Sequence, residues 1–205
     1  MDGLTAQWIE PAVASRARAG EAQSGDAWWL EEARDGVRVA VVDGLGHGPE
    51  AAAAANRALE LARAGAEETL PAVVRRCHAG LHVTRGVALS LAHIDAAAGT
   101  VTWIGVGNVT CLIARPDGSR AAPVHNLLPA RGVVGRRLPP LAARTVPVAA
   151  GEVLILSTDG VDAHFQFNLP GLDPLQGAAD DILRRFSTGD DDALVVMLRY
   201  RGVAA

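Results

Sequence analysis

The residues best suited to chemistry in this sequence are aspartates that stand next to predicted strands. Asp26 and the run Asp190 to Asp192 precede a strand, whereas Asp43 and Asp159 follow one. In an antiparallel sheet the start of one strand lies beside the end of its neighbour, so all four acidic sites can converge on one edge. Carboxylates brought that close repel one another unless protons or cations neutralise them. Hard oxygen ligands without Cys or His favour Mg²⁺ or Mn²⁺ over zinc.

Asp43 opens a glycine-rich turn, DGLGHG, between the apolar stretch Val37 to Val42 and an alanine-rich helix that begins at Pro49. Such a turn can cradle a phosphate on helix N–H groups. Here the order is G-x-G-x-G rather than G-x-G-x-x-G, an aspartate stands where the phosphate would approach, and the chain has no lysine for a P-loop. Singly, each acidic site is also compatible with a plain turn and a solvated carboxylate. Their shared placement at strand ends favours one metal site.

Composition and charge exclude several classes of protein. The 205 residues are 49% hydrophobic and 4% aromatic, which predicts a single globular domain over residues 1–205 with a core of Ala, Val and Leu. A net charge of -4 argues against a nucleic-acid partner. No apolar run approaches the roughly 20 residues of a membrane span, and the N-terminus lacks a signal pattern. We therefore expect a cytoplasmic protein without a membrane partner, and two reduced, buried thiols at Cys77 and Cys111.

Hydrophobic periodicity predicts the elements that position the aspartates. In the first half of the chain these are a strand at Thr5–Val13, a hairpin of Ala27–Leu30 with Val37–Val42, and helices at Pro49–Ala64 and Thr69–His82. Three short strands follow at close intervals, VALSLAHID, TVTWIGV and VTCLIA, and predict an antiparallel meander.

The second half of the chain is less regular. Residues 121–150 are rich in Pro, Gly and Arg, which predicts extended connections with one or two short strands. The strand VLILST then leads into Asp159, a helix is expected over Leu175–Phe186, and a final strand over Ala193–Tyr200 follows the acidic run.

Taken in order, these motifs resemble a known family. They are DGLGHG with its alanine helix, Ser24-Gly25-Asp26, GVALSLAHID, Gly105-Val106-Gly107-Asn108, LSTDG, and an Asp-Asp pair before the last strand. This ordered set is similar to the metal-dependent protein phosphatases, also called protein phosphatase 2C, and to their bacterial SpoIIE/RsbX-like branch. The resemblance runs from about Ala14 to Tyr200. It implies an α+β fold, a four-layer αββα sandwich of two antiparallel sheets flanked by pairs of helices, without the flap subdomain of larger members.

The resemblance also implies a centre for two ions, Mn²⁺ or Mg²⁺, at one edge of the sandwich. The implied ligands are all oxygen donors: Asp26, Asp43, the carbonyl of Gly44, Asp159 and Asp191. Asp43 would bridge both ions, and Gly44 would bind one of them. Asp159 and Asp191 would hold the other, while Asp26 would act directly or through water.

Two positions near the final strand need comment. Aligning that strand on the family pattern selects Asp191 rather than Asp190 as the ligand. Relatives usually have Thr two residues beyond the Asp-Asp pair, whereas this chain has Leu194.

The mechanism implied is direct attack of an activated water on phosphorus, without a phosphoenzyme. His47 would protonate the leaving oxygen or would instead cap the following helix; the sequence leaves both open. Arg16 or Arg18, in the loop before Asp26, would hold the substrate phosphate.

The function implied is a serine/threonine protein phosphatase, a cytoplasmic monomer whose partner is a phosphorylated STAS-domain regulator of a stress-response pathway. The basic, Gly-rich segment Arg131 to Arg137 is a candidate surface for that partner. Two alternatives remain: a catalytically weak pseudophosphatase that binds a phosphoprotein, and a hydrolase of small phosphoesters. Retention of all four acidic sites speaks against the first, and nothing in the sequence excludes the second.

Overall fold

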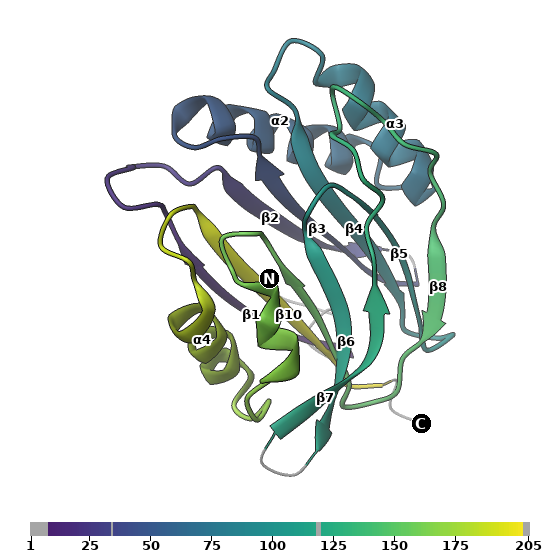
Figure 1. Ribbon diagram of the computed structural model, residues 1–205. Helices are drawn as coiled ribbons and strands as arrows, with labels where there is room; N and C mark the ends of the chain where they lie inside the picture. Colours follow the sequence, from purple (N-terminus) through teal and green to yellow (C-terminus); the bar gives the residue numbers. More distant parts are fainter. Residues whose placement is uncertain (1–7, 34, 118–119, 203–205) are drawn as a thin grey trace.

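Two five-stranded antiparallel sheets stack face to face in the computed structural model, which describes residues 8–33, 35–117 and 120–202 (Figure 1). One sheet has the order β1 (Ile9–Arg16), β10 (Ala193–Tyr200), β9 (Val153–Ser157), β6 (Thr110–Asp117), β7 (Arg120–Leu127). The other has the order β2 (Asp26–Ala33), β3 (Gly36–Gly44), β4 (Val87–Asp95), β5 (Thr100–Val106), β8 (Arg144–Pro147). The expected sandwich of two antiparallel sheets is confirmed.

Helices cover the outer face of each sheet, which gives the four expected layers. Helices α2 (Pro49–Ala64) and α3 (Leu70–Gly80) lie over the β2–β8 sheet, and α4 (Leu175–Phe186) with the short 3₁₀ helix η1 (Ala163–Phe167) lies over the other (Figure 1). The expectation of helix pairs on both faces is therefore wrong for the second face of the described chain. Among the described residues, no helix is long and apolar enough to cross a membrane.

Strand β3 shows how the apolar pattern builds the sandwich. Val37, Val39 and Val41 point into the core between the sheets, while Ala40 and Val42 pack under the helices. Because both faces of the strand are buried, its sequence is almost continuously apolar rather than alternating. Arg38 is the exception near its start, where it donates to the Glu68 carbonyl, and Asp43 is the exception at its end, at the edge of the core.

Most predicted elements appear close to their predicted bounds. Helices α2 and α4 and strand β10 coincide with the predictions, and α3 is shorter than Thr69–His82 by a few residues. The hairpin of β2 with β3 is confirmed. The first strand begins at Ile9 and extends to Arg16; the predicted start, residues 5–7, lies outside the described residues. Residues 121–150 hold most of β7 and the short β8, as expected.

The predicted three-strand meander is wrong at its last strand. β4 pairs with β5, but β6 crosses to the other sheet and pairs with β7 and β9. The crossing passes through Gly107, whose φ of 110° suits glycine, and a side-chain carbon there would lie 2.4 Å from the Ala88 Cβ. Either pairing buries the same apolar residues of β6, so local periodicity does not select between the two sheets.

Candidate metal centre

The β2–β3 hairpin supplies the first two aspartates of the centre. Asp26 is the first residue of β2 and Asp43 the penultimate residue of β3, and the antiparallel register places the two directly opposite each other. The backbone N–H of Gly44 donates to the Gly25 carbonyl at 3.0 Å, which extends the pairing past both aspartates. The hairpin therefore brings two carboxylates together at one end of its sheet.

The other sheet supplies three more aspartates at the same end of the sandwich. Asp159 follows β9, and Asp191 and Asp192 precede β10, which pairs with β9. Their charges act on Asp26 and Asp43, so the five carboxylates form one cluster. The expected convergence is confirmed, although it joins the ends of two stacked sheets rather than the edge of one.

Burial and mutual repulsion make this cluster unfavourable as bare carboxylates. Burial raises the pKa of Asp26 to about 8, and the charges of Asp43 and Asp192 add to the rise. Burial raises the pKa of Asp43 to about 7, with further contributions from Asp159 and Asp191. The pKa of Asp159 is also raised, first by burial and then by Asp191. A cation bound among these carboxylates would favour their ionised forms and so offset the burial and repulsion.

Two polar side chains hold the ligands in place. Thr158 Oγ1 donates to Asp26 Oδ2 at 2.6 Å and accepts from the backbone N–H of Leu194 at 3.0 Å. Asn108 Nδ2 donates to Asp159 Oδ2 at 2.6 Å. Both hydrogen bonds oppose the rise in carboxylate pKa. Backbone N–H groups of Asp159 and Gly160 add to the hydrogen bonds that hold the Asp159 carboxylate.

Asp192 is a structural member of the cluster. It is 3% exposed, and its carboxylate accepts the backbone N–H groups of Gly25 at 2.7 Å and of Arg18 at 2.8 Å. Its own N–H donates to Asp191 Oδ1 at 2.9 Å. Asp192 therefore fixes the β1–β2 loop against the start of β10, and it orients Asp191.

Two glycines allow the backbone to approach closely around the site. A side-chain carbon at Gly44 would lie 2.2 Å from the carbonyl oxygen of Ala51 in α2. One at Gly160 would lie 1.9 Å from the carbonyl oxygen of Asp192. Any larger residue would push α2 away from the hairpin, or the β9 turn away from β10.

The donor set fits a hard divalent cation. All five side chains offer oxygen atoms, and no Arg or His forms an ion pair with any of them within the described ranges. Mg²⁺ and Mn²⁺ prefer such carboxylate oxygens. The cluster therefore lacks an internal source of the positive charge that its burial requires.

The remaining predicted site residues lie around this cluster. His47 does not cap α2 with its side chain: the N-cap is Gly48, and the His47 Nδ1 atom lies 2.6 Å from Oε1 of Glu21. Arg18 contacts the cluster through its backbone. Arg16 Nη2 would lie 3.9 Å from a side-chain carbon at Gly189, beside the loop that leads to the aspartates.

Asp190 and Asp191 differ in their exposure and in their effect on the cluster. Asp190 is exposed and does not contribute to the raised pKa of Asp43 or Asp159, whereas Asp191 contributes to both. This geometry agrees with Asp191 as the ligand. The assignment of individual ligands stays a prediction.

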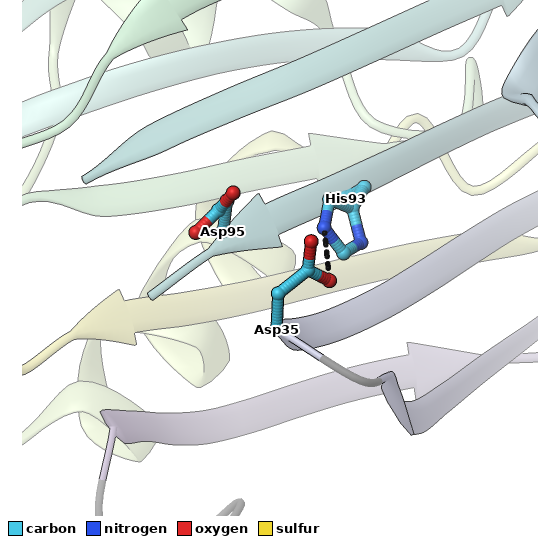
Figure 2. Close-up of side chains that lie close together, drawn as sticks. All are labelled: Asp35, His93 and Asp95. Atoms are coloured by element: carbon cyan, nitrogen blue, oxygen red, sulfur yellow. Dashed lines mark ion pairs between the residues drawn. The ribbon is translucent and has the colours of Figure 1, made fainter. Parts of the chain in front are cut away.

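A second group of possible ligands lies at the opposite end of the β2–β8 sheet. Asp35, between β2 and β3, faces His93 and Asp95 of β4 (Figure 2). His93 Nε2 and Asp35 Oδ1 are 3.1 Å apart and form an ion pair when the imidazole is protonated. This group is separate from the cluster of five because Asp95 pairs with Gly36, whereas Asp43 pairs with Ala88 at the other end of the same strands.

Known proteins share this fold. The chain is 25% identical over 154 residues, 75% of each protein, to the phosphoserine phosphatase RsbX of Bacillus subtilis strain 168. A chain solved in work on the bacterial stressosome, a modular system adapted to control secondary messenger signalling, has a TM-score of 0.81 and 27% identity, covering 93% of this chain and 99% of that one. RsbX solved in complex with magnesium has a TM-score of 0.79 and 22% identity, covering 95% and 96%.

The fold and the acidic cluster define a phosphatase domain of the protein phosphatase 2C class. Within that class, the family model described as Stage II sporulation protein E (SpoIIE) matches residues 33–201, and the chain therefore belongs to the SpoIIE family. The expected enzyme class, a serine/threonine protein phosphatase, is confirmed at this level. Solved members of the class hold magnesium or manganese, which agrees with the expected cofactors.

Sequence reasoning missed three supporting residues. Thr158 was visible only as part of LSTDG, and Asn108 only as the end of a turn motif. Glu21 lies in a loop of small and polar residues that has no periodicity to mark it. Only a long-range contact reveals each role, so no local signal could have found them.

Proposed function

We propose that the protein removes phosphate from phosphoserine or phosphothreonine on a folded STAS-domain regulator, using two divalent ions, Mn²⁺ or Mg²⁺. The observation that carries the proposal is the cluster of five aspartates, which is partly buried, mutually repulsive and without a basic ion-pair partner in the described chain. The likeness to RsbX and to a stressosome chain supports the choice of substrate. The protein would act as a monomer in the cytoplasm and reset a partner-switching pathway after a kinase.

The proposed ligands are those expected from the sequence. Asp43 would bridge the ions with the Gly44 carbonyl beside it, and Asp159 and Asp191 would complete the second position. Asp26 would bind directly or through water. When bound, the ions would lower the pKa of a water and draw the phosphate dianion into line with it.

The protein's own side chains would position the substrate, offset its charge and donate a proton. The anchored carboxylates set the position at which substrate phosphorus can approach, and Asp192 keeps the β1–β2 loop in place beside it. Arg16 or Arg18 would offset the negative charge of the incoming phosphate. His47 would donate a proton to the departing serine or threonine oxygen.

The partner surface is proposed to include the segment Arg131 to Arg137. A shallow pocket of about 360 Å³ is lined by Arg131, Gly132 and Val133 together with Asn108 and with Leu45 of the glycine turn that follows Asp43. The neighbouring Arg136 donates to the Arg85 carbonyl at 3.3 Å, which holds the segment against the start of β4. The arginines of this segment, beside the pocket, would complement an acidic surface on the phosphoprotein.

The test is direct. The protein would be incubated with Mn²⁺ and a kinase-phosphorylated STAS protein from the same genome, and the intact mass of the STAS protein followed over time. We expect loss of one phosphate mass, and no loss in excess EDTA. Retention of the phosphate alongside fast turnover of small phosphoesters would favour the small-molecule hydrolase instead. Inactivity on both substrate types would favour the pseudophosphatase.

A further inference from the structure

Glu21 and His47 form a close pair between two segments that adjoin the aspartate cluster in sequence, the loop before Asp26 and the turn after Asp43. The two residues come from different segments, the β1–β2 loop and the glycine turn that follows Asp43. His47 Nδ1 lies 2.6 Å from Glu21 Oε1, and the Glu21 side chain is only 25% exposed against 47% for His47. The glutamate is therefore the better fixed of the two.

The carboxylate of Glu21 also lies at the N-terminus of α2. A side-chain carbon on Gly48, the N-cap residue, would be 2.9 Å from Glu21 Oε2. No hydrogen bond from the N-cap side chain occupies this helix end, because the residue is glycine. A negative charge at this end of a helix is favoured by the helix dipole. Glu21 is thus held by two attractions that do not depend on substrate.

The loop that carries Glu21 is tied down on both sides. Glu21 N donates to the Arg18 carbonyl at 3.0 Å, and Arg18 N donates in turn to the buried Asp192 at 2.8 Å. Gly25 N donates to the other oxygen of Asp192 at 2.7 Å. The same aspartate that orders the cluster therefore fixes the loop from which Glu21 reaches His47.

We propose that Glu21 is a positioning residue that holds His47 as the acid of the phosphatase reaction. This inference rests on the proposed function. The carboxylate accepts the Nδ1 hydrogen and so fixes the ring orientation; in the imidazolium form the Nε2 hydrogen is then the one to be transferred, and the Nδ1–H tautomer held by Glu21 is left behind. Within the described residues no hydrogen bond to His47 Nε2 is present.

The step balances as a simple hydrolysis. The oxygen of a water forms a new bond to phosphorus, and the bond from phosphorus to the serine or threonine oxygen breaks. The electron pair of that bond stays on the departing oxygen, which takes the proton from His47 Nε2. The attacking water releases one proton to solvent, and solvent returns one to His47, so an alcohol and inorganic phosphate are formed.

The first test uses substrates that differ in their need for an acid. The leaving group of a phosphoserine peptide is a basic serine alkoxide. The leaving group of p-nitrophenyl phosphate is a stable phenolate that needs no proton. In Glu21→Gln we expect kcat on the peptide to fall at least about tenfold, with KM little changed and turnover of p-nitrophenyl phosphate nearly unaffected. His47→Gln should show the same split. Glu60→Gln, which removes an exposed carboxylate of α2 paired with Arg57, is the matched control and should change neither rate.

The second test needs no activity. In metal-free protein, ¹⁵N NMR of the His47 ring should report a protonated Nδ1 in the wild type and a shifted tautomer population in Glu21→Gln. Equal losses on both substrates, or no loss on the peptide, would overturn the inference while leaving the proposed function intact. Failure of the wild type with both esters would overturn the proposed function and this inference with it.

Discussion

The pair of strands β3 and β4 has a group of acidic residues at each end, and the negative charge of the two groups is compensated in different ways. At one end, Asp35 and Asp95 lie beside His93, and the Asp35 side chain is 55% exposed. The Asp35 charge is therefore exposed to water, and His93 adds a hydrogen-bonding partner within the protein. At the other end, Asp43 joins four further aspartates in a partly buried cluster without a basic ion-pair partner among the described residues. Only the second arrangement lacks a basic partner of its own, which is why we propose it, and not the first, as the metal centre.

Removing one charge from each group gives the largest contrast. Asp43→Asn should lower kcat/KM at least about a hundredfold, because it removes the carboxylate proposed to serve both ions. Asp35→Asn is the matched control: it removes one partner of an exposed ion pair, and activity should stay within about twofold while stability changes by less than about 1 kcal/mol. The measurement is turnover of a phosphoserine peptide in Mn²⁺, with thermal melts of each variant. Comparable activity losses in both variants would contradict the contrast.

A smaller contrast lies inside the cluster itself. Asp191→Asn should reduce activity by about ten- to a hundredfold and raise the Mn²⁺ concentration needed for half-maximal activity. The reason is that the charge of Asp191 acts on both Asp43 and Asp159. Asp190→Asn alters an exposed carboxylate and should be much milder. Titrating Mn²⁺ against activity for both variants would measure the difference. The reverse order would mean that the register proposed for the ligands of β10 is off by one.

The smallest effect is on stability as a function of pH. Folded protein keeps protons on Asp26 and Asp43 up to pH values of about 8 and 7, because burial raises each pKa above 3.8. The unfolded chain releases them near 3.8, so metal-free protein should lose stability as pH rises from about 4 toward those values. Bound metal requires the ionised carboxylates, so its stabilisation should grow over the same range.

Melting temperatures in EDTA and in Mg²⁺, at pH 5 and pH 8, would measure both trends. Asp35→Asn should show the same slopes as the wild type. A metal-free melting temperature that rises with pH across this range would contradict the burial of the cluster.

The sequence was most informative where the local pattern decides the structure. Helix α2 and strand β10 follow from apolar periodicity and their flanking Gly, Pro and Asp residues, and both appear at their predicted bounds. The strand ends that carry Asp26, Asp43, Asp159 and Asp191 follow from the same signals. The cluster was therefore predictable as a set of residues.

Long-range pairing was not predictable. The crossing of β6 to the other sheet depends on whether β8 or β6 takes the edge beside β5, and the short, exposed β8 has no apolar pattern that would mark it as that partner. The contact of Glu21 with His47 joins two loops, and the three consecutive aspartates before β10 look alike until burial separates Asp190 from Asp192. Each of these depends on tertiary packing rather than on neighbours in sequence.

The hydrogen bond from Thr158 to Asp26 spans 132 positions of the chain and joins the two sheets. Contacts that distant form late in folding, because a long loop must close before they can contribute. The β2–β3 hairpin can assemble early from adjacent segments, but its two carboxylates then face solvent without their partners. We therefore expect a nascent chain to acquire hydrolytic competence only when its last strand, β10, has docked. A phosphatase assembled in this way has an intrinsic delay between synthesis and action on its targets.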